Sequence, residues 1–241
     1  MKDKIYIWGK NPVLELLRAK SRPAEKVYVQ NSRAKEYAKL LSPLGIKFQK
    51  LDKGKMHNLI DRPDHQGIIA ETVEYNYADF LQIADIPAGF IVLAEGITDP
   101  QNLGAMIRSC YLLGAKGLII PEKYSASITN IVTHTSAGAT EYLAIARVES
   151  IANAINELKR RNFDILASLP SGKDVHDIRE VELSDKIALL MGSEGEGIKK
   201  STQKCCDRFI TIPQAGQLDS FSVSAATAVL AYQIADKMGI I

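Results

Sequence analysis

The sequence predicts an α/β fold built on a mostly parallel sheet, because strand-like and helix-like segments alternate along most of its 241 residues. Residues 90–94 are apolar at every position, as expected of a strand that is buried on both faces. Residues 187–191 form a second run of this kind, and each run is followed by a polar turn and a helix-like segment. These observations predict parallel strands joined by helices that cover both faces of the sheet.

The first 75 residues predict a small α/β domain. Asn11 followed by Pro12 has the pattern of a helix N-cap and a first helical residue. The predicted helices cover residues 11–19, 34–44 and 55–60. The predicted strands cover residues 26–30, 47–51 and 67–73. Residues 76–88 are predicted to form a linker with room for one helical turn.

Residues 89–241 predict a second, larger domain, in which strands and helices alternate more regularly. The predicted strands cover residues 90–94, 117–121, 142–148, 163–167, 187–191 and 209–212. The predicted helices cover residues 103–113, 127–137, 151–161, 198–206 and 225–238. In an open sheet of this kind, ligands bind beyond the carboxyl ends of the strands. We therefore expect the functional residues in the turns that follow the strands.

The composition is that of a globular protein and excludes several classes. Apolar residues make up 46% of the chain and charged residues 24%. No apolar run approaches the roughly 20 residues that span a bilayer, and the N-terminus lacks the core of a signal peptide. We expect a cytoplasmic protein without a membrane partner. The three cysteines, Cys110, Cys205 and Cys206, contain no Cys-x-x-Cys pair and indicate reduced thiols rather than a zinc site or a disulfide framework.

Positive charge is concentrated in the first 75 residues. They hold 15 Lys and Arg against 9 Asp and Glu, a net charge of +6, whereas the rest of the chain has a net charge of −4. A basic small domain beside an acidic larger one suggests a module that binds a polyanion, attached to a catalytic body. Chance clustering of solvated charges explains the charge distribution equally well when it is considered alone.

Three polar turns stand where a predicted strand ends and a helix begins, at residues 102–108, 191–197 and 212–224. The glycines of the second turn have the wrong spacing for a dinucleotide site, and Ile198 stands where a P-loop has lysine. This spacing disfavours a dinucleotide dehydrogenase and a nucleotide hydrolase. It leaves either a tight structural turn or a loop whose backbone approaches another ligand closely.

Five polar side chains in these turns are candidates for catalysis. Asn102 is predicted to cap a helix, and Arg108 lies two turns along that helix. Glu194 either rigidifies its own loop or holds an arginine in place. Ser222 and Ser224 are candidate caps of the last helix, a position that also suits an anion. An exposed ion pair for Arg108 and simple capping for the serines remain open alternatives.

Taken in order, the three turns resemble the three motifs of the SpoU (TrmH-type) family of RNA ribose 2′-O-methyltransferases. Asn102, Gly104 and Arg108 match the first motif. Residues 191–197 match the second motif, Met-Gly-x-Glu-Gly-x-Gly, and residues 212–224 match the third. Three motifs in the right order are a specific signal, although any one of them alone would be weak.

The resemblance extends into the N-terminal domain and so covers nearly the whole chain. Residues 9–15 and 65–70 are similar to the substrate-binding domain of the family, which is related in fold to a ribosomal RNA-binding protein. The resemblance implies an RNA-binding domain at residues 1–75, a linker at 76–88 and a methyltransferase domain with a C-terminal trefoil knot at 89–241.

The resemblance also implies a cofactor, a substrate and site residues. The cofactor would be S-adenosylmethionine, without a metal, and the enzyme would be a homodimer. The substrate would be RNA rather than DNA, and the branch resembled is the one that methylates a guanosine of 23S rRNA. The cofactor contacts would be Gly192, Gly197, Ile212, Pro213 and Phe221. The catalytic residues would be Asn102, Arg108, Glu194, Ser222 and Ser224.

The chain departs from the third motif of the family at two positions. The family reads Ser-Leu-Asn-Val-Ser, where residues 220–224 of this chain read Ser-Phe-Ser-Val-Ser. Phe221 keeps an apolar side chain in place of leucine, whereas Ser222 replaces an amide with a shorter hydroxyl. This departure keeps a non-catalytic RNA-binding or assembly protein open as an alternative, beside a tRNA ribose methyltransferase.

Overall fold

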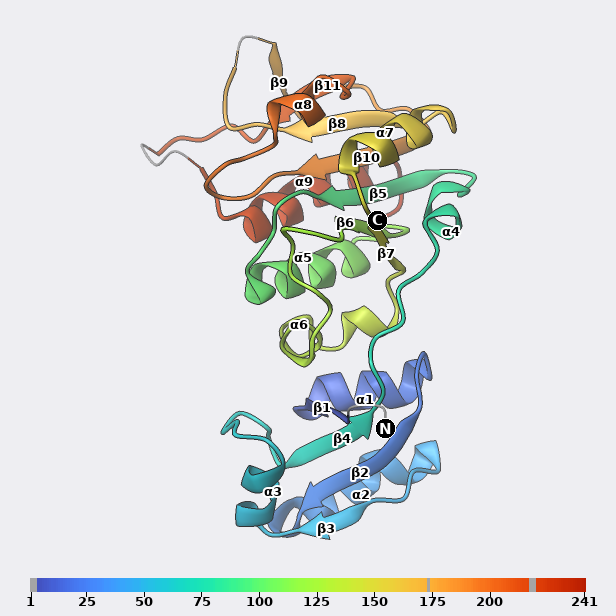
Figure 1. Cartoon of the computed structure of the whole chain (residues 1–241), viewed down its shortest axis with the longest axis vertical. Helices are drawn as coiled ribbons and strands as arrows, with labels where there is room; N and C mark the ends of the chain where they lie inside the picture. The colour runs from blue at the N-terminus through green and yellow to red at the C-terminus, as the bar shows by residue number, and fades with distance from the viewer. Residues whose placement is uncertain (1–3, 173, 217–219) are drawn as a thin grey trace. The chain divides into compact units, whose positions relative to one another are not determined.

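A computed structural model describes residues 4–172, 174–216 and 220–241, which form two compact units (Figure 1). The first unit combines the chain up to Asn76 with Ile128–Tyr142. The second combines Tyr77–Ser127 with Leu143–Ile241. The chain therefore passes between the units three times. The excursion at Ile128–Tyr142 was not foreseen from the sequence, in which it lies inside the predicted larger domain.

The first unit contains a four-stranded sheet in the order β1-β4-β2-β3. Strand β4 pairs antiparallel with β1 and β2, and β3 is parallel to β2. The strands are β1 (Ile5–Trp8), β2 (Ala24–Gln30), β3 (Gln49–Leu51) and β4 (Ile68–Thr72). The helices are α1 (Lys10–Ala19), α2 (Ala34–Leu41), α3 (Lys53–Leu59) and α6 (Asn130–Thr135), with 3₁₀ turns at Asn31–Arg33, Ser42–Leu44 and Ala139–Glu141.

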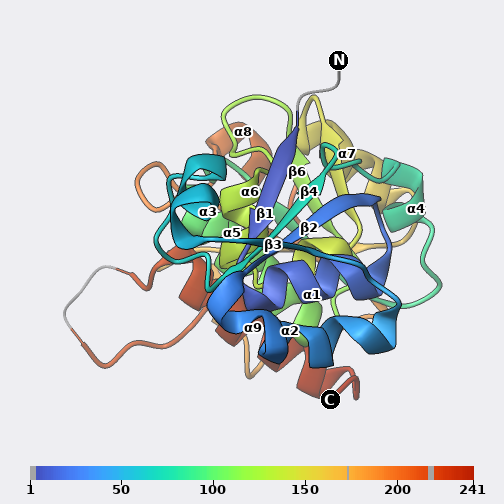
Figure 2. The ribbon, with the colours of Figure 1, turned by 90° about the horizontal axis from the view of Figure 1, so that it is seen from below.

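Alternate residues of this sheet point to opposite faces and build two cores. Val27 and Val29 pack with α1 and α2, whereas Tyr28 between them packs with α3. Figure 2 shows α1 and α2 on one side of these strands and α3 on the other. Leu14 and Leu17 of α1 are buried, and each such side chain contributes about 1.5–3 kcal/mol to folding.

Two predictions for the start of the chain differ from the structure. Helix α1 begins at Lys10, with Gly9 as its N-cap at a φ of 91°, so Asn11 lies inside the first turn and is not the cap. Glycine reaches this left-handed conformation at little cost, which allows the sharp turn from β1 into α1. Strand β1 was not predicted, although the isoleucines and aromatic rings of Ile5–Trp8 are typical of a strand.

A buried ion pair ties Ile128–Tyr142 into the first unit. Arg22 Nη2 lies 2.7 Å from Glu141 Oε1 and Arg22 Nε lies 3.2 Å from Glu141 Oε2, which makes the pair bidentate. The side chain of Arg22 is 6% exposed and that of Glu141 is 0% exposed. Ser21 donates a further hydrogen bond to Glu141, and Arg22 donates one to the carbonyl of Val73. These partners satisfy two charges that would otherwise be costly to bury.

The second unit contains a seven-stranded sheet in the order β7-β6-β5-β10-β8-β11-β9, and all of its pairings are parallel. This confirms the predicted mostly parallel sheet. The strands are β5 (Gly89–Ala94), β6 (Leu118–Pro121), β7 (Ile145–Val148), β8 (Asp164–Ser168), β9 (Val175–Asp177), β10 (Lys186–Met191) and β11 (Arg208–Thr211). The helices are α4 (Phe80–Ala84), α5 (Pro100–Leu112), α7 (Ile151–Lys159), α8 (Lys200–Gln203) and α9 (Val223–Lys237).

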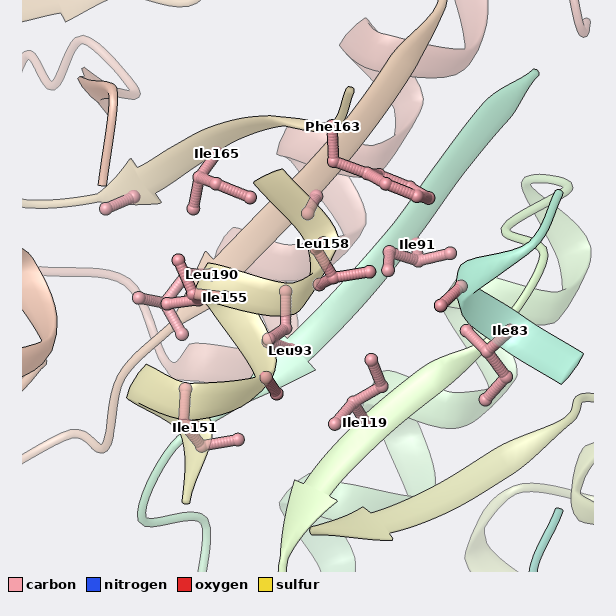
Figure 3. Packing of buried hydrophobic residues seen from close by; sticks show 14 of the residues in the cluster. Ile83, Ile91, Leu93, Ile119, Ile151, Ile155, Leu158, Phe163, Ile165 and Leu190 are labelled. Atoms are coloured by element: carbon pink, nitrogen blue, oxygen red, sulfur yellow. The ribbon is translucent and has the colours of Figure 1, made fainter. Parts of the chain in front are cut away.

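Helices cover both faces of this sheet, with α7 on one face and α9 on the other (Figure 1). Figure 3 shows Ile151, Ile155 and Leu158 of α7 packed against Ile91 and Leu93 of β5. Close packing of this kind holds the central strands rigidly, and with them the turns at their carboxyl ends. Among the residues described, no helix combines the length and the apolar character needed to cross a membrane.

The start of α5 corrects a further prediction. Asp99, rather than Asn102, is the N-cap, since Asp99 Oδ1 accepts a hydrogen bond of 2.9 Å from the backbone N–H of Gln101. Pro100 occupies the first helical position, which its fixed φ favours. Asn102 therefore lies in the first turn of α5 and its amide is not used for capping.

Two of the three cysteines have thiols that resist ionisation. Cys110, Cys205 and Cys206 are free. Burial raises the pKa of the Cys110 thiol to about 12. Burial also raises the pKa of the Cys206 thiol to about 12, with a smaller contribution from the neighbouring Cys205. Both thiols therefore stay protonated at neutral pH and behave as small apolar side chains.

We expect Glu141→Gln to destabilise the first unit by about 3–5 kcal/mol, because it leaves the guanidinium of Arg22 buried without a counter-charge. Trp8 is the one tryptophan of the sequence and lies in this unit, so its fluorescence during urea unfolding reports on the unit. Glu36→Gln breaks an exposed pair with Arg33 and should cost far less stability, because solvent screens exposed ion pairs. An equal loss in the two variants would contradict the structural role of the buried pair.

Candidate active site

The three polar turns, as far as the structure describes them, meet at one edge of the sheet in the second unit. They follow β5, β10 and β11, and these strands are parallel to their neighbours, so their carboxyl ends lie on the same side. Two cavities open at this edge, one of about 810 Å³ and one of about 480 Å³. This is the position at which the sequence predicted a ligand site.

Four of the predicted catalytic residues form a hydrogen-bonded group, which we call the polar cluster: Asn102, Glu194, Ser222 and Ser224. Asn102 Nδ2 donates to Glu194 Oε1 at 3.2 Å, and Ser224 Oγ donates to Asn102 Oδ1 at 3.1 Å. Ser222 Oγ lies 3.3 Å from Ser224 Oγ. Residues from three separate turns, far apart in the sequence, are therefore brought into direct contact.

The polar cluster is connected to the start of α9. Ser222 is the N-cap of this helix, and its hydroxyl accepts a hydrogen bond of 3.3 Å from the backbone N–H of Ala225. Glu194 Oε1 accepts a hydrogen bond of 3.2 Å from the backbone N–H of Val223. A carboxylate is stabilised at this helix end by the helix dipole. Capping of α9 therefore explains part of the role of Ser222. Glu194 has two structural effects, since its carboxylate orients the Asn102 amide and also fixes its own loop to the start of α9.

Arg108 lies apart from the polar cluster. It is exposed on α5, two turns after the start of the helix. Within the described part of the chain, its guanidinium forms no hydrogen bond or ion pair. The structure therefore leaves this cation available for a phosphate or for a residue of another subunit.

The smaller cavity contains most of the predicted cofactor contacts. Gly192, Gly197, Ile212 and Phe221 line it, together with the end of β8. Pro213 follows Ile212 in the chain but does not line the cavity. Asp219 of the third turn lies outside the described residues.

The glycine loop closes on itself and requires glycine at its first position. A Cβ atom at Gly192 would lie 2.4 Å from the carbonyl carbon of Gly197 and 2.5 Å from the nitrogen of Ile198. The backbone N–H of Gly197 donates to the carbonyl of Ser193 at 3.0 Å, and Gly197 has a φ of 66°. The loop is thus a tight turn, which was one of the two alternatives predicted from the sequence, and its residues line the smaller cavity.

Glu95 is a site residue that the sequence analysis missed. It follows β5 and is 5% exposed. Its Oε2 atom accepts a hydrogen bond of 3.0 Å from the backbone N–H of Lys199, and its Oε1 atom accepts one of 2.8 Å from Thr202 Oγ1. These bonds hold the segment after the glycine loop against the end of β5. The signal in the sequence is a carboxylate placed directly after a strand that is apolar throughout.

The polar cluster lies between the two cavities. Glu194 and Val223 line both of them, whereas Asn102 lines the larger one. The larger cavity also contains the side chains of Lys123, Tyr124 and Lys199. An amide and a carboxylate at this boundary can orient a hydroxyl group in one cavity toward a group held in the other.

Comparison with known proteins identifies the family. The model of the SpoU rRNA methylase family matches residues 89–232, and the model of the RNA 2′-O ribose methyltransferase substrate-binding domain matches residues 6–78. A protein of Mycobacterium ulcerans named as an uncharacterized tRNA/rRNA methyltransferase is 33% identical over 238 residues, which are 95% of this chain and 76% of the relative.

Solved structures support the fold. The SpoU methyltransferase AviRb from Streptomyces viridochromogenes, in complex with AdoMet, has a TM-score of 0.80 at 20% identity, over 97% of this chain and 90% of that one. An AdoMet-bound rRNA methyltransferase from Sinorhizobium meliloti has a TM-score of 0.77 at 20% identity, over 96% and 86% of the two chains. Since the family model spans more than half of the sequence and the Mycobacterium relative matches nearly all of it, the chain belongs to the SpoU family of RNA methyltransferases.

Proposed function

We propose that this protein transfers a methyl group from S-adenosylmethionine to a ribose 2′-hydroxyl of RNA, and that its target is a guanosine of 23S rRNA. The observation that carries this proposal is the polar cluster, which is built from all three family motifs and stands between two cavities. The cofactor is supported by two structures of similar fold whose names record bound AdoMet.

The smaller cavity fits the cofactor. Its volume of about 480 Å³ is in the range of small-molecule sites. Backbone atoms at Gly192 and Ile212 would bind polar edges, and Phe221, which is 45% exposed, would offer an apolar face to the adenine. The cofactor supplies a methyl group already activated by its sulfonium, so the transfer itself requires no metal.

The polar cluster would prepare the ribose hydroxyl for attack. A hydroxyl is a weak nucleophile at neutral pH and must lose its proton as it reacts. Glu194 and Asn102 face the larger cavity. The Glu194 carboxylate would accept the proton that the hydroxyl loses, and the Asn102 amide, held in place by Ser224, would orient the hydroxyl. The hydroxyl of Ser222 caps α9 and contacts Ser224, which supports a working site despite the missing family asparagine.

Arg108 would bind the RNA phosphate next to the target ribose and stabilise the negative charge that develops on the attacking oxygen. Arginine is effectively always protonated in proteins, so this electrostatic role is preferred to that of a base. The exposed guanidinium, without a protein partner among the described residues, fits the role.

A homodimer would cover the surface around Arg108. Leu112 is 65% exposed and lies four residues after Arg108, so the two share one face of α5. Val229 and Tyr232 of α9 are 39% and 50% exposed, and α9 packs against α5. A second copy seated on these apolar side chains would bring its own residues close to Arg108. The C-terminal trefoil knot of the domain remains a prediction from the family.

The first unit would select the RNA. Residues 6–78 match the substrate-binding family model, and the first 75 residues have a net charge of +6. Binding through basic side chains releases counterions from the RNA, so the affinity should fall steeply as the salt concentration rises.

The function is tested by transfer of labelled methyl from S-adenosylmethionine to separated, unmodified 23S rRNA, 16S rRNA and tRNA. We expect label in 23S rRNA alone, recovered as 2′-O-methylguanosine. Label in tRNA would retain the chemistry and refute the proposed substrate. RNA binding without label in any pool would favour the non-catalytic alternative, and Ser222→Asn would then be the variant to assay for a gain of activity.

We expect Arg108→Ala to lower kcat/KM for RNA by at least about 100-fold, because a charge-stabilising donor is worth about 2.7 kcal/mol or more in the transition state. The affinity for S-adenosylmethionine, measured by calorimetry, should be unchanged. The matched control is Arg160→Ala, because Arg160 is an exposed arginine that follows α7 as its C-cap and is paired with Glu157. Normal turnover by Arg108→Ala would refute the role of this residue.

We expect Gly192→Ala to weaken cofactor binding by about 1–3 kcal/mol, since the added methyl group collides with the backbone of Gly197 and Ile198. Gly195→Ala is the control within the same loop, because a Cβ atom there has nothing within 4 Å. Calorimetric titration with S-adenosylmethionine measures both variants. Equal affinities would show that the closed shape of the loop does not matter for the cofactor.

A further inference from the structure

Tyr124 presents an aromatic ring at the edge of the larger cavity. It is 78% exposed, the highest value among the large apolar and aromatic side chains in the part of the chain that the structure describes. The residue lies in the second unit, on the loop that follows β6. Burial in a core therefore does not explain the presence of this ring.

The backbone holds Tyr124 in a conformation that a bulky residue rarely adopts. Its φ is 59°, in the left-handed region that favours glycine. The loop is fixed on both sides of it: the backbone N–H of Glu122 donates to Val148 at 2.8 Å, and that of Ala126 donates to Ile97 at 2.8 Å. Strained residues that are fixed by their surroundings cluster at functional sites. Glycine would suit this backbone better, so the backbone conformation does not explain why position 124 carries an aromatic side chain.

Two lysines accompany the ring. Lys199 Nζ lies 5.6 Å from the centroid of the Tyr124 ring, within the range of a cation–π contact. Lys123 precedes Tyr124 in the chain, and both lysines line the larger cavity. The backbone of Lys199 is anchored by Glu95, which fixes the point from which its side chain extends.

The carboxylates of the larger cavity differ in how far they are already engaged in hydrogen bonds within the protein. Glu95 and Asp99 are occupied as acceptors of backbone N–H groups, and Glu194 belongs to the polar cluster. Glu149 and Glu196 are exposed at the cavity and can accept hydrogen bonds from the amino groups of a base. An aromatic face, two ammonium groups and free carboxylate acceptors together suit a nucleotide.

We propose that Tyr124 is a stacking platform for a nucleobase of the RNA substrate, and that Lys123 and Lys199 bind the phosphate beside that base. This subsite rests on the proposed function, because the same cavity of about 810 Å³ is lined by Asn102 and Glu194. A base stacked on Tyr124 would hold its strand along the cavity and so position the target ribose at the polar cluster. Stacking accepts every base, so the platform supplies affinity and placement rather than base choice.

The test of the ring compares KM for RNA in Tyr124→Phe, Tyr124→Leu and Tyr124→Gly. The phenylalanine variant keeps the stacking face and should behave as the wild type. The leucine and glycine variants should raise KM about tenfold or more, with the affinity for S-adenosylmethionine unchanged. Glycine is the informative variant, because it suits the backbone at this φ. If the glycine variant keeps the wild-type KM, the platform is refuted.

The lysines are tested by the salt dependence of RNA binding. Lys199→Gln should reduce the slope of log affinity against log salt concentration by about one, as expected for the loss of one phosphate contact. Lys200→Gln is the matched control, because Lys200 is the next residue, is exposed and does not line the cavity. Equal slopes for the two variants would overturn the phosphate contact.

Failure of the proposed function can be distinguished from failure of the platform. If the wild type methylates no RNA pool, the proposed function fails, and the platform is then judged from binding of a short, fluorescently labelled single-stranded RNA of mixed sequence. Loss of affinity in Tyr124→Leu and Tyr124→Gly, with retention in Tyr124→Phe, would support it. Unchanged affinity in all three variants would refute it.

Discussion

The site depends on the parallel pairing of β5 with β10. In this register Met191 lies opposite Ala94, so the two strands end side by side. The backbone N–H of Glu95 then donates to the carbonyl of Met191 at 2.8 Å, which extends the pairing one residue beyond the strands. A shift of one residue would turn every side chain of β10 to the other face of the sheet. The buried side chains between α7 and β5 therefore stabilise the fold and also fix the strand register on which the geometry of the site depends.

The strands of the second unit could largely be predicted from the sequence, because a strand buried on both faces is a continuous apolar run. Short elements without such a run were missed. Val175–Asp177 forms an edge strand of three residues with little apolar character. The short helix Phe80–Ala84, in contrast, lies where the sequence predicted a linker with one helical turn. Helix starts were displaced where the cap came from an earlier residue, as with Asp99 before Asn102.

The polar cluster could be predicted because its residues stand in turns with a specific order of motifs, and the structure brings four of the five candidates together. Other features of the larger cavity are visible only in the structure and have no pattern in the sequence. The positive φ and the exposure of Tyr124 cannot be read from the sequence. Arg108 was predicted from its motif, and the fold places it, exposed and without a partner among the residues described, apart from the other four.

The excursion at Ile128–Tyr142 connects the loop that carries Tyr124 to the first unit through the covalent chain. The loop that carries Tyr124 runs from β6 in the second unit into Ile128, where the chain enters the first unit. Glu141 then anchors the end of the excursion on Arg22 through a buried bidentate pair. A buried pair of this kind adds little net stability compared with apolar packing, but it fixes one arrangement of the segment, because every alternative leaves a charge unpaired. The loop that carries Tyr124 lines the same cavity as Asn102 and Glu194, and it is continuous in sequence with a segment that this pair anchors within the first unit.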